Sequence, residues 1–234
     1  MKVNNIQTQY HKLMPSKNAI KEYEAGAYYH IYNRGVEERT IFQDDQDYKT
    51  FLSYLKIYLT APNLQGLSLK EDSISPSRQP KNYSDSVCLL AFCLMPNHFH
   101  LLIKQNDDHS ISYFMSSVLT KYVRYFNTRH KRIGHLFQGR YKAVKIENEY
   151  QWIHLSKYIH RNPLDLSTFK DSPCKLEEYK YSSFQNYLGL IAQSWVHPDE
   201  IIANFGDRRH NSYQNFVTED LDISPIYFSA IDYD

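Results

Sequence analysis

Cysteine, glycine, proline and long apolar runs are all scarce in this chain. Its 234 residues include only 3 cysteines, 7 glycines and 9 prolines, which excludes collagen-like and low-complexity classes and, because three is odd, a closed disulfide framework. The longest uncharged apolar run, Val87 to Met95, has nine residues, whereas a membrane span needs about 20. Cys88 and Cys93 have odd spacing within it, which predicts small buried side chains on opposite faces of a strand. With no apolar signal segment at the N-terminus, we expect a soluble cytoplasmic protein with no membrane partner.

Charge of both signs is nearly balanced overall but is unevenly distributed. The net charge is +1, yet residues 109–146 hold eight Lys or Arg and no Asp or Glu, whereas residues 199–234 hold eight Asp or Glu and two Arg. A basic stretch of this kind indicates a polyanionic partner. A solvated helix face would give the same pattern, so composition alone leaves both interpretations open.

The first half of the chain predicts two strands around a helix, then a third strand. Residues 27–33 are rich in aromatic and β-branched residues, which is typical of a strand, and residues 44–59 show helical spacing behind two aspartates. After a serine-rich loop at residues 61–86, Val87–Met95 is apolar on both faces, as a central strand should be. His98–Gln105 alternates and follows a tight turn, which predicts an antiparallel hairpin.

The second half predicts two longer helices separated by a strand. Residues 111–130 have the clearest helical periodicity, residues 136–147 indicate a strand or bent hairpin with a bulge at Gly139, and Asn148 can cap a helix that ends near Arg161. The order β-α-β-β-α-β-α predicts an α+β, ferredoxin-like antiparallel sheet with two helices on one face and one additional helix. Beyond Asp165 we expect only short helices, at residues 182–190 and 198–205.

Strand alternation gives two histidines a specific place. If Phe99, Leu101 and Ile103 face the two helices, then His98 and His100 lie side by side on the opposite, uncovered face. This spacing suits the binding of one divalent ion with positions left open. Two ordinary surface histidines would give the same short pattern.

The last long helix carries a polar stripe beside an apolar one. His154, Tyr158 and Asn162 follow one another at i, i+4 and i+8, and Asn162 precedes a proline, so its backbone should leave the helix. For Tyr158 taken alone, packing is the better interpretation, since the sequence has twenty other tyrosines.

Four ordered motifs give these residues a family context. YHIYNRG, MPNHFHLL, GHLFQGRYK and YIHRNPL together resemble the single-tyrosine transposases of the HUH endonuclease superfamily, most closely the REP-associated tyrosine transposases. The resemblance implies that His98 and His100 are metal ligands, that Tyr158 is the nucleophile and that Asn162 is the third ligand, with His154 as an accessory that orients a neighbour or moves a proton. It divides the chain into an N-terminal arm (1–26), a catalytic domain (27–165, with 61–86 as an inserted loop) and a C-terminal extension with an acidic tail (166–234).

The same resemblance implies an activity and its partners. Such enzymes use Mg²⁺ or Mn²⁺ to cleave single-stranded DNA beside small hairpins, form a 5′-phosphotyrosine intermediate and rejoin strands, in DNA transposition at REP-like repeats. The expected partner is therefore single-stranded or hairpin DNA, which would associate the protein with the nucleoid, and the protein itself could be a monomer or a homodimer. The predicted DNA-binding residues are the basic ones of the stretch described above: Lys121, Arg124, Arg129, Lys131, Arg132, Arg140, Lys142 and Lys145. Tyr125, Phe137 and Tyr141 are candidates either for base stacking or for the core.

Two other functions remain open from the sequence. A non-catalytic ferredoxin-like protein derived from a transposase would bind nucleic acid without cutting it. A zinc hydrolase built on His98 and His100 would need further ligands nearby, and residues 101–106 offer none.

Overall fold

The protein folds around one antiparallel sheet. A computed structural model describes residues 23–62, 81–170, 172–206 and 209–219. Its four strands lie in the order β2-β3-β1-β4, with bounds Tyr28–Arg34 (β1), Val87–Met95 (β2), His98–Gln105 (β3) and Lys142–Ile146 (β4). The two strands at the centre are thus β1 and β3, and every pair is antiparallel. This is the order of a ferredoxin-like sheet, so the predicted fold class is confirmed.

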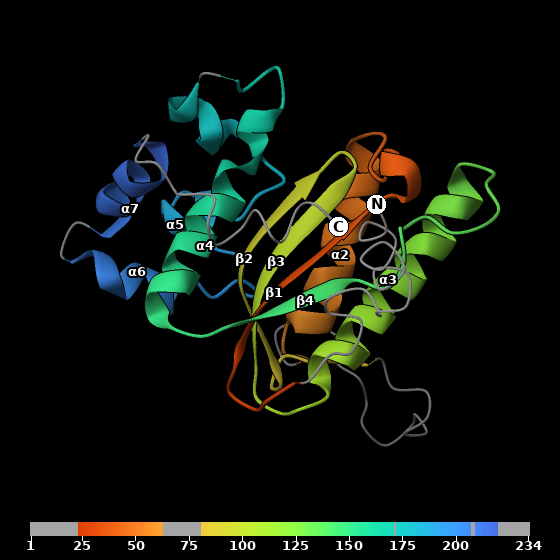
Figure 1. Ribbon diagram of the computed structural model, residues 1–234, viewed down its shortest axis with the longest axis horizontal. Helices are drawn as coiled ribbons and strands as arrows, with labels where there is room; N and C mark the ends of the chain where they lie inside the picture. The colour runs from red at the N-terminus through yellow and green to blue at the C-terminus, as the bar shows by residue number, and fades with distance from the viewer. Residues whose placement is uncertain (1–22, 63–80, 171, 207–208, 220–234) are drawn as a thin grey trace, which may run out of the picture.

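Helices cover both faces of the sheet (Figure 1). On one face lie α2 (Asp45–Leu59) and α3 (Ser110–Arg129). On the other lie α4 (Glu149–Arg161) and, outside it, the short helices α5 (Phe184–Tyr187), α6 (Asp199–Ile202) and α7 (Arg209–Thr218). Single-turn 3₁₀ helices connect these elements at Val36–Glu38 (η1), Asn162–Asp165 (η4), Pro173–Glu178 (η5) and Ala203–Phe205 (η6). The prediction that His98 and His100 lie on an uncovered face is therefore wrong, because α4 packs there.

Side-chain caps fix where α2 and α4 begin. The Asp44 carboxylate accepts hydrogen bonds from the backbone N–H groups of Gln46 and Asp47, at 3.0 and 3.2 Å. Asn148 accepts from the backbone of Gln151 at 3.0 Å, as predicted. Such caps satisfy N–H groups that the helix itself leaves unpaired. They also set the rotation of each helix against the sheet.

The strand β2 lies at the edge of the sheet, not at its centre as its sequence predicted. It is apolar on both faces because helices cover both, and its free edge is occupied by the C-terminal segment. Leu94 N–H donates to Tyr181 O at 2.9 Å, and Ser183 N–H donates to Phe92 O at 3.0 Å. These bonds protect an edge that would otherwise expose backbone groups.

A β-bulge in β2 changes which residues share a face. The register with β3 shifts between Leu89 and Ala91, so the residue between them has no single partner. As a result Cys88 pairs with Lys104 and Cys93 with His100, which places both cysteines on the α4 side. The prediction of opposite faces is wrong for this reason.

Other predicted elements differ at their ends. The segment 136–141 contributes one isolated bridge, between Phe137 and Gly35, and the fourth strand is limited to Lys142–Ile146. The predicted short C-terminal helices are present, and α7 follows them without having been predicted. Gly35 ends β1 at a close approach of the chain, since a Cβ there would lie 2.1 Å from Arg39 O.

Three predicted segments fall largely outside the described residues. These are most of the N-terminal arm, the central part of the inserted loop and the acidic tail, and the domain boundaries stay predictions. In the part of the chain that the structure describes, no helix is both long and apolar enough to cross a bilayer.

Candidate active site

The strands β1 and β3 build the floor of the site. Successive even-numbered residues of β3 point to the α4 face, and in the antiparallel register His98 lies opposite Arg34 and His100 opposite Tyr32. His100 is 2% exposed, whereas His98 is half-buried at the open end of the sheet. Their ring centroids are 5.0 Å apart. The predicted pair is therefore side by side, with one member accessible and one enclosed.

The helix α4 brings the other two predicted residues to this floor. Asn162 Oδ1 lies 3.1 Å from His98 Nε2, and the Asn162 amide donates to the backbone oxygen of Tyr158 at 3.0 Å. The Tyr158 ring meets the His100 ring edge to face, with centroids 5.4 Å apart and planes at 82°. All four residues predicted as nucleophile and metal ligands thus come together within one chain.

A third histidine, missed in the sequence, completes the floor. His30 of β1 is fully buried; its Nε2 lies 2.8 Å from His100 Nδ1, and the two rings stack with centroids 5.0 Å apart. It also contacts the rings of Tyr32 and Tyr158. The signal was present in the alternation of β1, because His30 shares a face with Tyr32, but only the pairing with β3 places it beside His100.

Burial keeps the two enclosed histidines neutral. It lowers the pKa of His30 to about 3. Burial also lowers the pKa of His100 well below its ordinary value, and the nearby charges of His98, His30 and Arg34 add to this effect. A neutral imidazole is the form that binds a metal ion.

The donor atoms fit a divalent ion that accepts imidazole nitrogens together with a carbonyl oxygen, with an amide in place of a charged third ligand. Among the described residues no group of three or more His, Cys, Asp or Glu side chains could hold a metal. The predicted set instead combines His98, His100 and the Asn162 carbonyl. The separation of 3.1 Å between His98 Nε2 and Asn162 Oδ1 is close to the ~3 Å between neighbouring ligands of an octahedral ion with bonds of about 2.1 Å. Asn97 Oδ1, 2.7 Å from His98 Nδ1, orients that ring.

The contacts of His154 are with residues outside this group. Its ring packs on Tyr150, with centroids 4.0 Å apart, and against Phe216 of α7 at 5.3 Å. Burial lowers its pKa, and the charge of Lys157 adds to this effect. An accessory role for His154 stays a prediction, and its packing favours a positioning function.

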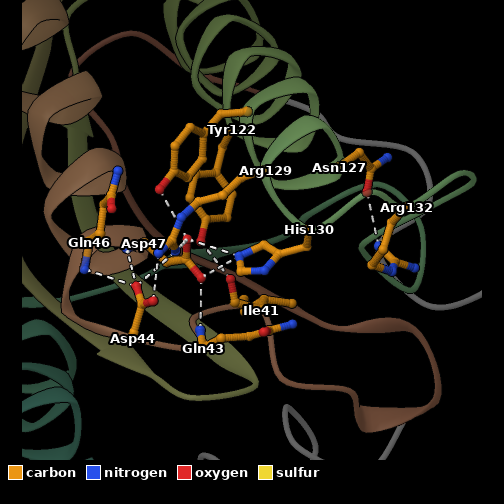
Figure 2. Close-up of polar contacts among 11 residues, drawn as sticks. Ile41, Gln43, Asp44, Gln46, Asp47, Tyr122, Asn127, Arg129, His130 and Arg132 are labelled. Atoms are coloured by element: carbon orange, nitrogen blue, oxygen red, sulfur yellow. Dashed lines mark hydrogen bonds and ion pairs between the residues drawn. The ribbon is translucent and has the colours of Figure 1, made fainter.

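Three of the eight predicted DNA-binding residues contact carboxylates or tyrosine rings. Arg129 forms ion pairs with Asp44 and Asp47, both at 2.6 Å (Figure 2). Lys145 pairs with Glu24 at 2.6 Å. Lys121 lies over the rings of two tyrosines of α2.

The other five predicted DNA-binding residues lie in different surroundings. Arg124 and Arg140 line a cavity of about 760 Å³ between α3 and residues 134–140. Lys142 lies opposite Tyr32 in the sheet, Lys131 is exposed, and Arg132 donates to Asn127 at 2.9 Å.

The predicted stacking aromatics are mostly internal. Phe137 is 7% exposed and belongs to the core. The hydroxyl of Tyr125 donates to Asp47 at 3.0 Å, and that of Tyr141 lies 2.7 Å from the hydroxyl of Tyr23. The core role, left open from the sequence, therefore holds for Phe137.

Solved structures show only distant similarity to this chain. A REP-associated tyrosine transposase bound to a REP hairpin aligns with a TM-score of 0.49 and 17% identity, over 79% of this chain and 92% of that one. A candidate transposase from Deinococcus radiodurans R1 gives 0.34 and 14%, over 64% and 97%. The tRNA(His) guanylyltransferase of Saccharomyces cerevisiae gives 0.36 and 12%, over 92% and 86%. The fold assignment rests on the strand order, not on these values.

The sequence itself provides the family match. No curated protein matches the chain, but residues 79–162 match the family described as "Transposase IS200 like". This segment contains the hairpin with His98 and His100 and the whole of α4, up to Asn162. Over the part of the chain that builds the site, the sequence is thus similar to IS200-like transposases, and this similarity supports a transposase role.

Proposed function

We propose that this protein is a divalent-metal-dependent endonuclease and strand transferase for single-stranded DNA, with Tyr158 as its nucleophile. It acts beside hairpins of REP-like repeats and mobilises DNA through a 5′-phosphotyrosine intermediate. The family match supports the transposase class, and the four sequence motifs support the substrate.

One observation carries the proposal. The phenol of Tyr158 packs against His100, while Asn162, one helical turn later, reaches His98 with its carbonyl oxygen. The proposed nucleophile and the three proposed metal ligands are thereby brought together by α4 and its packing on β3.

The chemistry follows from the properties of a phenol. Its ordinary pKa is about 10, so it is a weak nucleophile at neutral pH. A divalent ion held by His98, His100 and Asn162 would polarise the scissile phosphate and stabilise the departing oxygen. Tyr158 Oη forms a bond to phosphorus as the bond to the 3′ oxygen breaks; the phenol loses its proton to solvent, and the 3′ oxygen takes one up. The phosphotyrosine retains the bond energy, so a second 3′-OH can attack it and restore a phosphodiester without ATP.

Basic side chains border the site on the same sheet face. Arg34 lies opposite His98, and Lys142 lies opposite Tyr32. Both positions suit contacts to phosphates on either side of the cleaved bond. The burial of His100 restricts water there, which favours attack by the phenol over hydrolysis.

The Tyr158→Phe variant tests the nucleophile. It removes one hydroxyl and keeps the ring against His100, so we expect loss of all covalent adduct with labelled hairpin oligonucleotides and little change in hairpin affinity. Denaturing gel electrophoresis with and without Mn²⁺ measures the adduct, and a mobility shift measures binding.

The matched control is Tyr150→Phe, on the exposed side of the same helix, which should leave adduct formation unchanged. Adduct in the Tyr158→Phe protein would assign the nucleophile elsewhere. Binding without cleavage by the unmodified protein, on every hairpin with added Mn²⁺, would favour the non-catalytic DNA-binding function.

A further inference from the structure

A histidine outside the predicted ligand set lies behind one of the ligands. His30 is 0% exposed in the middle of β1, between Leu102 of β3 and Val144 of β4. A fully buried polar side chain costs stability unless it is hydrogen-bonded. Its hydrogen bond goes to His100 Nδ1, at 2.8 Å.

The two candidate histidine ligands have partners of different kinds. His98 Nδ1 faces Asn97 Oδ1 at 2.7 Å, and a carbonyl oxygen can only accept, so with a metal ion between Nε2 and Asn162 Oδ1 the ring proton of His98 lies on Nδ1. His100 Nδ1 faces an imidazole nitrogen, which can either donate or accept. Only when His100 donates from Nδ1 is its own Nε2 free to bind a metal ion.

We propose that His30 is a positioning residue that accepts the Nδ1 proton of His100 and so holds His100 in its metal-binding tautomer. This inference rests on the proposed function and extends its ligand set by one partner. In this arrangement His30 carries its own proton on Nδ1, an atom that has no hydrogen-bond partner in the described structure. If His30 donated to His100 instead, the same atom would be an unpaired acceptor, so the unpaired group costs stability in either tautomer.

Two variants of nearly equal shape separate the hydrogen bond from packing. His30→Gln keeps a side-chain oxygen that can accept from His100, whereas His30→Met fills similar space without a strong acceptor. We expect the Met variant to raise the Kd for Mn²⁺ alone by about 10- to 100-fold, as loss of such a partner does elsewhere. The Gln variant should stay within about threefold of the unmodified protein. Electron paramagnetic resonance of free Mn²⁺ measures the Kd without any DNA.

The outcomes separate this inference from the proposed function. Equal Mn²⁺ affinity in the Met variant and the unmodified protein would overturn the role of His30 while the nuclease assignment stands. An unmodified protein that binds no Mn²⁺ and forms no adduct would reject the proposed function and, with it, this inference.

A measurement on the unmodified protein keeps the inference testable if either variant fails to fold. In ¹⁵N-histidine spectra with saturating Mg²⁺, His100 should carry its proton on Nδ1, with a coupling through the hydrogen bond to His30 Nε2. A His100 ring protonated on Nε2 in the Mg²⁺-loaded protein would overturn the proposal.

Discussion

Two clusters of polar side chains, each built around buried members, lie on opposite faces of the sheet and follow different rules. The carboxylate cluster consists of Asp44, Asp47, Arg129 and His130 and joins the start of α2 to the end of α3 (Figure 2). The imidazole cluster consists of His30, His98 and His100 on the α4 side. Both clusters take polar side chains out of water. Only the carboxylate cluster pairs side chains of opposite charge with one another.

In the carboxylate cluster every oxygen of the buried Asp47 has a partner. One oxygen accepts from Arg129 at 2.6 Å and from Tyr125 at 3.0 Å, and the other accepts from the backbone of Gln43 and from His130, both at 2.9 Å. A network satisfied in this way rigidifies a structure. In the imidazole cluster, burial keeps His30 and His100 neutral, and His30 Nδ1 has no hydrogen-bond partner among the described residues.

The strongest test of this contrast is the loss of an imidazole. His98→Ala should lower Mn²⁺-dependent cleavage by at least about 100-fold, because one metal ligand is lost. It should change the free energy of unfolding by less than about 1 kcal/mol, since His98 is only half-buried. Single-turnover cleavage and urea unfolding measure the two effects. Unchanged cleavage kinetics would remove His98 from the site.

The reverse pattern is expected in the carboxylate cluster. Asp47→Ala leaves the N–H groups of Gln43 and the side chains of Arg129 and His130 without their acceptor, so the free energy of unfolding should fall by about 3 kcal/mol. Asp47→Asn retains the shape and one acceptor and should lose less. Urea unfolding measures both variants, and cleavage well below their melting temperatures should stay within about twofold of the unmodified protein. A stability loss under about 1 kcal/mol for Asp47→Ala would show that the cluster is not structural.

Sequence periodicity and a helix cap were sufficient to predict the bounds of two strands and the start of α4. The strands Val87–Met95 and His98–Gln105 have the bounds that alternation and the intervening turn predicted, and the Asn148 cap begins α4 as expected. These elements are encoded locally, by spacing and by caps.

What the sequence could not provide depends on contacts between distant segments. The edge position of β2 was missed because its apolar residues match a central strand, and only residues 181–183 reveal what covers the edge. The bulge in β2 moved Cys88 to the other face, because one extra residue inverts alternation and no local signal marks it. The ion pairs of Arg129 could not be read from the sequence for the same reason, since its acidic partners are more than 80 residues away, and its role in DNA binding stays a prediction.

The candidate site shows the same division. Tyr158, Asn162, His98 and His100 were found through motif spacing, which reports chemistry along one helix and one strand. His30 needed the register between β1 and β3, which pairs residues 70 positions apart. A motif names the candidate reactive residues, whereas a neighbour such as His30 appears only when the strands are paired.

The smallest expected effect is on the salt dependence of DNA affinity. It separates Arg129, which is ion-paired, from basic residues that are available to contact phosphates. Arg124 is exposed at the cavity beside α3, so Arg124→Ala should reduce the slope of log affinity against log salt by about 0.7 to 0.9, the value of one phosphate contact. Arg129→Ala should leave this slope unchanged, because Asp44 and Asp47 already neutralise its charge. Hairpin binding from low to high salt measures both variants at a temperature where each is folded. A reduced slope in the Arg129→Ala protein would mean that DNA displaces the two carboxylates, and the carboxylate cluster would then belong to the binding surface as well as to the fold.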